Sequence, residues 1–256
     1  MQKIILLILM LVLGSTCFGQ QQQEADFNKA VEYLKNENFK EAVKKFSQVI
    51  PTATDPQLKK LSYIYRAFSY NGLSDFKKSI LDLDSAIQLD PADIATYIDR
   101  GKVKGYLKDY DNAKSDFEYV LTKDSTTEQG KAALFFLGMI AFEQKKDKEA
   151  IKFYDRYLVL APDDAEGYFN RGCAKGMFLK DIEGSIKDYD KAIELSPNYA
   201  EAYANRGVAK INLLTTKGNI QPSKEQTKDA CEDLEKAKSL GDNSVDDMIF
   251  VYCGKK

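Results

Sequence analysis

The feature that most constrains this chain is a pattern that recurs five times at nearly constant spacing. Units beginning at Lys60, Ile94, Lys131, Ala165 and Ala200 are separated by 34, 37, 34 and 35 residues. A large apolar or aromatic residue stands fourth in each unit (Tyr63, Tyr97, Leu134, Tyr168, Tyr203), and a small one stands eighth (Ala67, Gly101, Gly138, Gly172, Gly207). This period and patterning predict repeated helix pairs, which must stack because one pair cannot bury its own apolar face.

The second half of each unit carries a small residue followed four places later by a large one, as at Ala113 and Phe117. A proline closes three of the units, where it ends the helix because it cannot donate the next backbone hydrogen bond. These prolines are Pro91, Pro162 and Pro197. With so many positions in register, residues 26–241 resemble the tetratricopeptide repeat (TPR) family. The resemblance implies an all-α solenoid, a right-handed superhelix of helix-turn-helix pairs with a concave side.

About six repeats are expected, because a weaker unit precedes the five clear ones. Its two helices are marked by Phe27, Ala30 and Tyr33, then by Phe39, Ala42 and Phe46. At the other end, apolar residues recur at helical spacing, and Ser244 with Asp247 forms a pair typical of a helix N-cap. The apolar residues are Val245, Met248, Ile249 and Tyr252. We expect this helix to cap the open apolar face of the last repeat.

The expected organisation has four parts: signal peptide 1–19, disordered leader 20–25, TPR array 26–241, and capping helix with tail 242–256. The last repeat departs from the pattern. Gly207 and Ala230 are 23 residues apart, whereas the equivalent positions of the second repeat, Ala67 and Ser79, are 12 residues apart. The extra residues fall within 215–228, which we expect to be a surface insertion. Contact with a partner is the alternative, since long loops often carry function.

The N-terminus predicts export. Lys3 precedes an apolar run over residues 4–13, and small residues follow up to Gly19. Such a run is shorter than the ~20 residues that span a bilayer, and the arrangement is typical of a cleaved secretory signal peptide. We therefore expect a periplasmic or secreted protein. A lipid anchor at Cys17 is an alternative, although no leucine stands three residues before it, and an uncleaved membrane anchor is another.

Composition narrows the classes of partner. The net charge is −2 with both signs interspersed, which gives no basic footprint for nucleic acid. After the first 19 residues no apolar run reaches membrane length, so the mature chain is not expected to insert into a membrane. The remaining class of partner is another protein or a peptide.

Charged residues recur in register inside the repeats. Position seven is Arg66, Arg100, Arg171 and Arg206, and three places after the small residue of the second helix the same units have Asp82, Asp116, Asp188 and Asp233. In the fourth unit both change together, to Leu137 and Phe153. This joint change predicts that the two positions touch between the helices of one repeat as an arginine–carboxylate pair. An arginine ladder that binds anions is the alternative.

The resemblance also implies where a ligand binds, because first-helix positions 2, 5, 9, 12 and 13 line the concave side of TPR arrays. Positions 5, 9, 12 and 13 give a mainly apolar candidate groove: Ile64, Phe68, Ile98, Lys102, Tyr106, Phe135, Met139, Phe142, Phe169, Met177, Val208 and Ile211. Polar residues of the kind that clamp a C-terminal carboxylate are scarce there. An exposed apolar row is typical of a protein-binding surface. The alternative is that these side chains pack between neighbouring first helices.

Catalysis is not expected. The chain has no histidine, which removes histidine-dependent nucleophiles and histidine metal sites. No glycine-rich phosphate-binding motif is present either. We therefore predict no catalytic residues, no cofactor and no metal.

The cysteines predict one covalent link. Cys231 lies on the last second helix and Cys253 on the predicted capping helix, so an oxidising compartment would allow a disulfide between them. Cys173 then remains as a small apolar residue.

Three functions are compatible with these patterns. The first is a non-catalytic exported adaptor or scaffold that binds a protein or peptide segment in an apolar concave groove. The second is a structural subunit of a cell-envelope assembly that contacts partners through its convex face or its ends. The third is an accessory module that delivers substrate to a separate enzyme.

Overall fold

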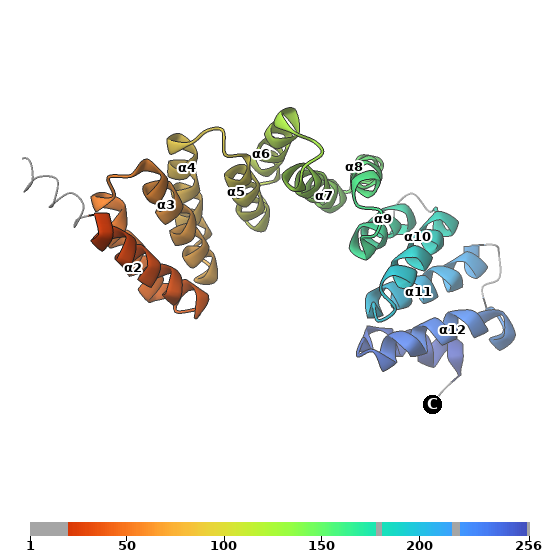
Figure 1. The fold of residues 1–256 in the computed structure, drawn as a ribbon. Coiled ribbons are helices and arrows are strands. Elements are labelled where there is room, and N and C mark those ends of the chain that lie inside the picture. The colour runs from red at the N-terminus through yellow and green to blue at the C-terminus, as the bar shows by residue number, and fades with distance from the viewer. Residues whose placement is uncertain (1–19, 178–180, 217–220, 255–256) are drawn as a thin grey trace, which may run out of the picture. The chain divides into compact units, whose positions relative to one another are not determined.

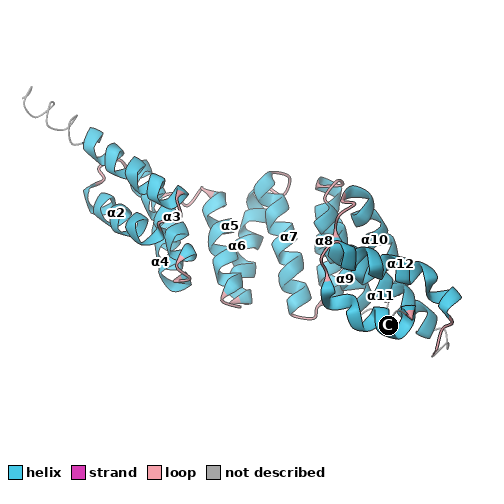
Figure 2. Ribbon diagram, turned by 90° about the horizontal axis from the view of Figure 1, so that it is seen from below, coloured by secondary structure: helices cyan, strands magenta, loops and turns pink. Residues whose placement is uncertain are grey.

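The computed structural model describes residues 20–177, 181–216 and 221–254. All regular secondary structure in these ranges is helical, and the helices follow one another as consecutive pairs (Figures 1 and 2). None of these helices is both long and apolar enough to cross a membrane. The chain divides after Lys123 into two compact units, called here the N-terminal unit and the C-terminal unit.

The described residues of the N-terminal unit form three helix pairs. A helix over residues 20–35 is followed by α2 (Phe39–Thr52), α3 (Pro56–Gly72), α4 (Phe76–Leu89), α5 (Ile94–Tyr106) and α6 (Tyr110–Lys123). The first pair closes on Ala30, Ala42 and Phe46, which are fully buried. These are positions that the sequence marked for the weak first repeat, so that repeat is present.

The C-terminal unit holds three further pairs and a cap. Its helices are α7 (Glu128–Glu143), α8 (Asp147–Leu160), α9 (Ala165–Met177), α10 (Ile182–Leu195), α11 (Ala200–Thr216) and α12 (Lys224–Ser239). A cap of three short turns follows: η1 (Asn243–Val245), α13 (Asp246–Met248) and η2 (Ile249–Cys253). Val245 and Ile249 of the cap are buried against Leu234 and Ala237 of α12. The cap therefore covers the end of the last repeat, as predicted.

The small residue at position eight has a direct steric cause. A Cβ atom built on Gly101 would lie 2.8 Å from the ring of Phe117, and one built on Gly138 would lie 2.7 Å from the ring of Tyr154. Both rings belong to the large residue of the second helix, and both are about 1% exposed. The two patterned positions are thus one contact between the helices of a pair.

The predicted arginine–aspartate pairs are confirmed in all four repeats. Each guanidinium binds its carboxylate through two hydrogen bonds, as in Arg171 to Asp188, where Nε and Nη2 donate over 2.9 and 2.7 Å. The other three pairs are Arg66–Asp82, Arg100–Asp116 and Arg206–Asp233. Each aspartate is buried. Each arginine also lies over the ring of the tyrosine three residues before it. The pairs are structural.

A second bond extends this arrangement between repeats, which the sequence pattern did not predict. Nη1 of Arg171 donates to Asp155 of the preceding repeat over 2.8 Å, so one guanidinium joins α9 to both α8 and α10. Arg100 with Asp84 and Arg206 with Asp190 repeat the contact at 2.6 and 2.7 Å. Each arginine therefore fixes the stacking of consecutive repeats as well as the closure of its own.

Three expectations about boundaries need correction. Residues 20–25 are helical, not a disordered leader, and Gln23 holds this turn by donating to the carbonyl oxygen of Thr52 over 2.7 Å. Of the segment 215–228, residues 215 and 216 belong to α11 and residues 224–228 belong to α12, which begins with a capping box of Ser223 and Gln226. Residues 217–220 lie outside the described part of the chain. The cap falls within the expected residues 242–256, but its N-cap residue is Asp242, whose carboxylate accepts from the backbone N–H of Ser244, and not Ser244. The predicted signal peptide and Cys17 lie outside the described residues.

Candidate functional site

Three of the predicted groove residues belong to the core. Ile64, Ile98 and Ile211 are 9%, 5% and 1% exposed. Ile64 packs in a buried cluster with Leu83 of α4, and Ile211 packs in one with Leu234 of α12. The assignment of these three to a binding surface was wrong.

The remaining candidates whose side chains are described stay at least partly accessible. Tyr106 is 71% exposed and stacks on Phe76 with ring centroids 5.8 Å apart, and Met139 is 40% exposed. Half-buried side chains are those of Phe68, Lys102, Phe135, Phe142, Phe169 and Val208. The side chain of Met177 lies outside the described part of the chain. Accessible aromatic surface is thus present in both units. A ligand also needs space, so a cavity is required to define a site.

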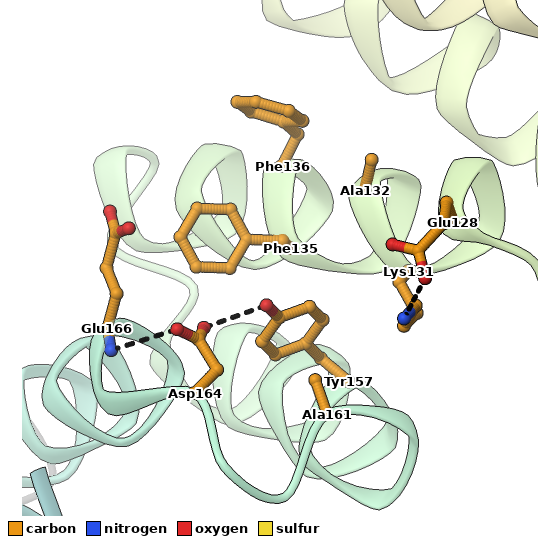
Figure 3. Close-up of a pocket in the computed structure, with 9 residues that line it drawn as sticks. All are labelled: Glu128, Lys131, Ala132, Phe135, Phe136, Tyr157, Ala161, Asp164 and Glu166. Atoms are coloured by element: carbon orange, nitrogen blue, oxygen red, sulfur yellow. Dashed lines mark hydrogen bonds and ion pairs between the residues drawn. The ribbon is translucent and has the colours of Figure 1, made fainter. Parts of the chain in front are cut away.

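A cavity of about 300 Å³ opens beside Phe135 in the C-terminal unit. Figure 3 shows the ring of Phe135 on α7 facing that of Tyr157 on α8, and their centroids are 5.2 Å apart. The small side chains of Ala132 and Ala161 leave the space between these helices unfilled. The other lining residues are Glu128, Lys131, Phe136, Asp164 and Glu166.

The position of Tyr157 follows from the start of α9. Its hydroxyl donates to Oδ2 of Asp164 over 2.8 Å, and the same carboxylate caps α9 by accepting from the backbone N–H groups of Glu166 and Gly167. Gly167 provides the room, since a Cβ atom there would lie 2.7 Å from the Tyr157 ring. Burial first, and then the hydrogen bond to Asp164, raise the pKa of Tyr157, which stays protonated as a donor. One wall of the cavity is therefore held rigidly.

A second cavity, of about 560 Å³, shares Asp164 and Glu166 with the first. It is lined further by the ends of α10 and α12 and by the first turn of α11: Ser196, Asn198, Tyr199, Ala200, Glu201 and Leu240. Tyr199 packs on Phe169 with ring centroids 4.9 Å apart. The two adjoining cavities form what we call the α7–α11 groove, defined by the residues that line them.

Selecting residues by their positions in the first helices identified only part of this groove. Phe135 was named from position five, whereas Ala132, Glu166 and Glu201 occupy position two, which the family also assigns to the concave side but which was not read residue by residue. Tyr157 and Asp164 belong to a second helix and a loop, which the first-helix positions do not include. Asp164 could have been found from its place just before the start of α9, because aspartate is a preferred helix N-cap residue.

The described ranges contain no cluster of three or more histidine, cysteine, aspartate or glutamate side chains that could hold a metal ion. Cys231 and Cys253, the pair named from the sequence, are joined as a disulfide with Cα atoms 5.6 Å apart. Cys173 is a free thiol, half-buried beside Tyr189 and Asn205, and burial raises its pKa. A raised pKa makes a thiol less nucleophilic at neutral pH, so its surroundings do not activate it.

Comparison with known proteins agrees with the geometry. Residues 98–165 match a family described as Tetratricopeptide repeat, and residues 179–213 match one described as TPR repeat. A stretch of 112 residues is 26% identical to Hsp70-Hsp90 organizing protein 2 of Arabidopsis thaliana. That match spans 43% of this chain and only 18% of the plant protein.

Solved structures extend the likeness to most of the chain. PilF of Pseudomonas aeruginosa superposes with a TM-score of 0.69 at 14% identity, over 91% of this chain and 97% of PilF. A tetratricopeptide repeat protein from Parabacteroides merdae gives 0.67 at 12% identity, over 91% and 99%. YrrB, described as a TPR protein with an unusual peptide-binding site, gives 0.57 at 21% identity, over 78% and 94%. These identities establish the fold alone. The repeat matches cover residues 98–165 and 179–213, and the paired helices give the described part of the chain a TPR-like solenoid fold.

Proposed function

We propose that this protein is a non-catalytic adaptor that binds a segment of a protein partner in the α7–α11 groove. The observation that carries the proposal is the pair of adjoining cavities on the side of the C-terminal unit where Phe135 and Phe169 lie. Each cavity is large enough for a ligand group, and each has an aromatic wall. TPR proteins mediate protein–protein interactions, and YrrB is a TPR protein described by its peptide-binding site.

We further propose that the adaptor works outside the cytoplasm. Lys3, the apolar run over residues 4–13 and the small residues up to Gly19 are typical of a secretory signal. The Cys231–Cys253 disulfide supports the same location, because such bonds persist in oxidising compartments. Fractionation of the native cells, followed by N-terminal sequencing of the purified protein, tests this. A cytoplasmic protein that retains residues 1–19 would contradict it.

Filling the first cavity tests the groove. Ala132→Trp places a large side chain in the space between Phe135 and Tyr157, and Val159→Trp is the matched control because Val159 is 80% exposed on α8, outside the groove. Each variant is immobilised in its mature form and used to capture partners from the native cell extract. The adaptor function predicts that Ala132→Trp loses a partner that the control retains. Identical capture by both variants, with unchanged helical content, would contradict groove binding.

A second function is favoured by a separate surface. Phe250 and Val251 of η2 are 67% and 65% exposed at the end of the C-terminal unit, although both are large apolar residues. Exposed apolar residues at the end of a solenoid suit stacking against another subunit. The Phe250→Asp variant distinguishes the functions, because it disrupts an assembly made through this end and leaves groove binding intact.

A further inference from the structure

The charge of the α7–α11 groove carries an inference about its ligand, which rests on the function proposed above. Four carboxylates line the two cavities, and one ammonium group accompanies them: Glu128, Asp164, Glu166 and Glu201 with Lys131. The whole chain, by contrast, is close to neutral, with a net charge of −2. The groove is therefore locally acidic, although the protein as a whole is close to neutral.

Two of the four carboxylates already have partners. Lys131 forms an ion pair with Glu128, and both lie on α7. Asp164 accepts three hydrogen bonds, one from the hydroxyl of Tyr157 and two from the backbone at the start of α9. These groups are occupied by the fold itself.

The other two carboxylates are free. The side chains of Glu166 and Glu201 are exposed and make no hydrogen bond or ion pair with the described residues. Both occupy the second position of their first helices, α9 and α11, which lie one repeat apart. Desolvation, and then the negative charge of Asp164, raise the pKa of Glu166.

The apolar part of the groove lies next to this free charge. In Figure 3 the side chain of Glu166 extends from the start of α9 along one side of the Phe135 ring, and the ring of Tyr157 lies on the other side. All three side chains line the first cavity. The first cavity is at the small end of the range for ligand sites, so it has room for one large side chain. A ligand that fills the groove must place an apolar group and a positive charge side by side.

We propose that the ligand is an extended protein segment in which a lysine or arginine adjoins a large apolar residue. The apolar side chain occupies the Phe135–Tyr157 cavity, and the cation lies between Glu166 and Glu201. An acidic segment, or a free C-terminal carboxylate, is disfavoured by the same charges, which distinguishes this groove from one that clamps a terminal carboxylate.

Three fluorescein-labelled peptides test the proposal by polarisation with the mature full-length protein. Each has the same glycine- and serine-rich frame around a central Phe-Leu pair, flanked on both sides by lysine, by glutamine or by glutamate. We expect affinity to fall in the order lysine, glutamine, glutamate, and the advantage of lysine to shrink as salt rises. Equal affinities, or preference for the glutamate peptide, would overturn the proposal.

Charge-neutralising variants locate the effect. Glu166→Gln combined with Glu201→Gln is expected to weaken the lysine peptide about five-fold, as two exposed charge contacts would, and to leave the glutamine peptide unchanged. Glu194→Gln is the control, because it removes one negative charge from an exposed side chain of α10 outside the groove. Loss of affinity for both peptides, or an equal effect of the control, would overturn the assignment.

The result also separates this inference from the adaptor function. If no peptide binds while Ala132→Trp still abolishes partner capture, the groove binds a segment of other chemistry and only the basic ligand is wrong. If Ala132→Trp has no effect and no peptide binds, both fail.

Discussion

The hydroxyl of Tyr157 donates a hydrogen bond to the carboxylate of Asp164 over 2.8 Å and thereby ties α8 to the start of α9. This bond sets the wall of the groove opposite Phe135, and Asp164 caps α9 through its backbone bonds at the same time. Asp164, a loop residue, therefore contributes both to the stability of the fifth repeat and to the shape of the candidate site.

Two variants separate these roles. Tyr157→Phe keeps the ring and removes the hydroxyl, so we expect a loss of about 1 kcal/mol in the free energy of unfolding. Asp164→Ala also removes the helix cap and is expected to cost a further ~1 kcal/mol. Urea unfolding measures both. Equal losses would mean that the tyrosine bond carries the whole effect and that the cap contributes nothing.

The arginine–aspartate pairs predict a large and coupled effect on stability. Arg171→Ala leaves Asp188 buried with Lys175 as its remaining ion-pair partner, and we expect a loss of about 3 kcal/mol. A double-mutant cycle with Asp188→Ala is expected to show strong coupling, because each variant removes the same pair. Arg156→Ala, at an exposed position of α8, is the control and is expected to be near neutral. Additive losses for Arg171 and Asp188 would contradict the pairing.

Asp99 predicts a stability that depends on pH. Burial, opposed by the charge of Lys102 and assisted by that of Asp93, raises the pKa of this carboxyl to about 6. Its folded pKa lies above the unfolded value, so the cost of ionisation is present above pH 6 and disappears as the pH falls toward 4. Asp99→Asn is therefore expected to stabilise the protein at pH 8 by about 3 kcal/mol, and to have little effect at pH 4.

Unfolding curves at both pH values measure this difference. Asp163→Asn, at an exposed loop position, is the control for the loss of one charge. The same gain at pH 4 and pH 8 would show that Asn stabilises for a reason other than ionisation.

The C-terminal disulfide predicts the number of free thiols. In protein that has lost residues 1–19, alkylation before reduction is expected to label Cys173 alone. The bond closes a loop with a sequence separation of 22, which corresponds to about 3 kcal/mol when the entropy of the unfolded chain is considered. After reduction, hydrogen exchange is expected to rise first in the cap and α12. Labelling of three cysteines would show that the disulfide is absent.

Repetition made much of the fold predictable. The arginine and aspartate positions could be paired from sequence because both changed together at Leu137 and Phe153, and because the small residue at position eight repeated with its large partner. Spacing along a helix defines which face a residue occupies but not how deep it lies. For this reason Ile64, Ile98 and Ile211 were assigned to the groove although the neighbouring helices cover them.

The groove itself depends on contacts that no repeat position records. Tyr157 reaches it from a second helix, and Asp164 reaches it from the loop before α9, where one carboxylate serves both the cap and the tyrosine. The bond from Arg171 to Asp155 was missed for a related reason, since it joins consecutive repeats and the pattern was read within single repeats.

Site-specific photo-cross-linking in the native host tests the central claim most directly. A photoreactive phenylalanine analogue replaces Phe136, which lines the first cavity, or Val159, which is exposed on α8 outside it. The groove account predicts that irradiation joins a defined protein partner to position 136 and not to position 159, and that Ala132→Trp abolishes the adduct. Adducts at position 159 alone, or an adduct at position 136 that persists with Ala132→Trp, would contradict it.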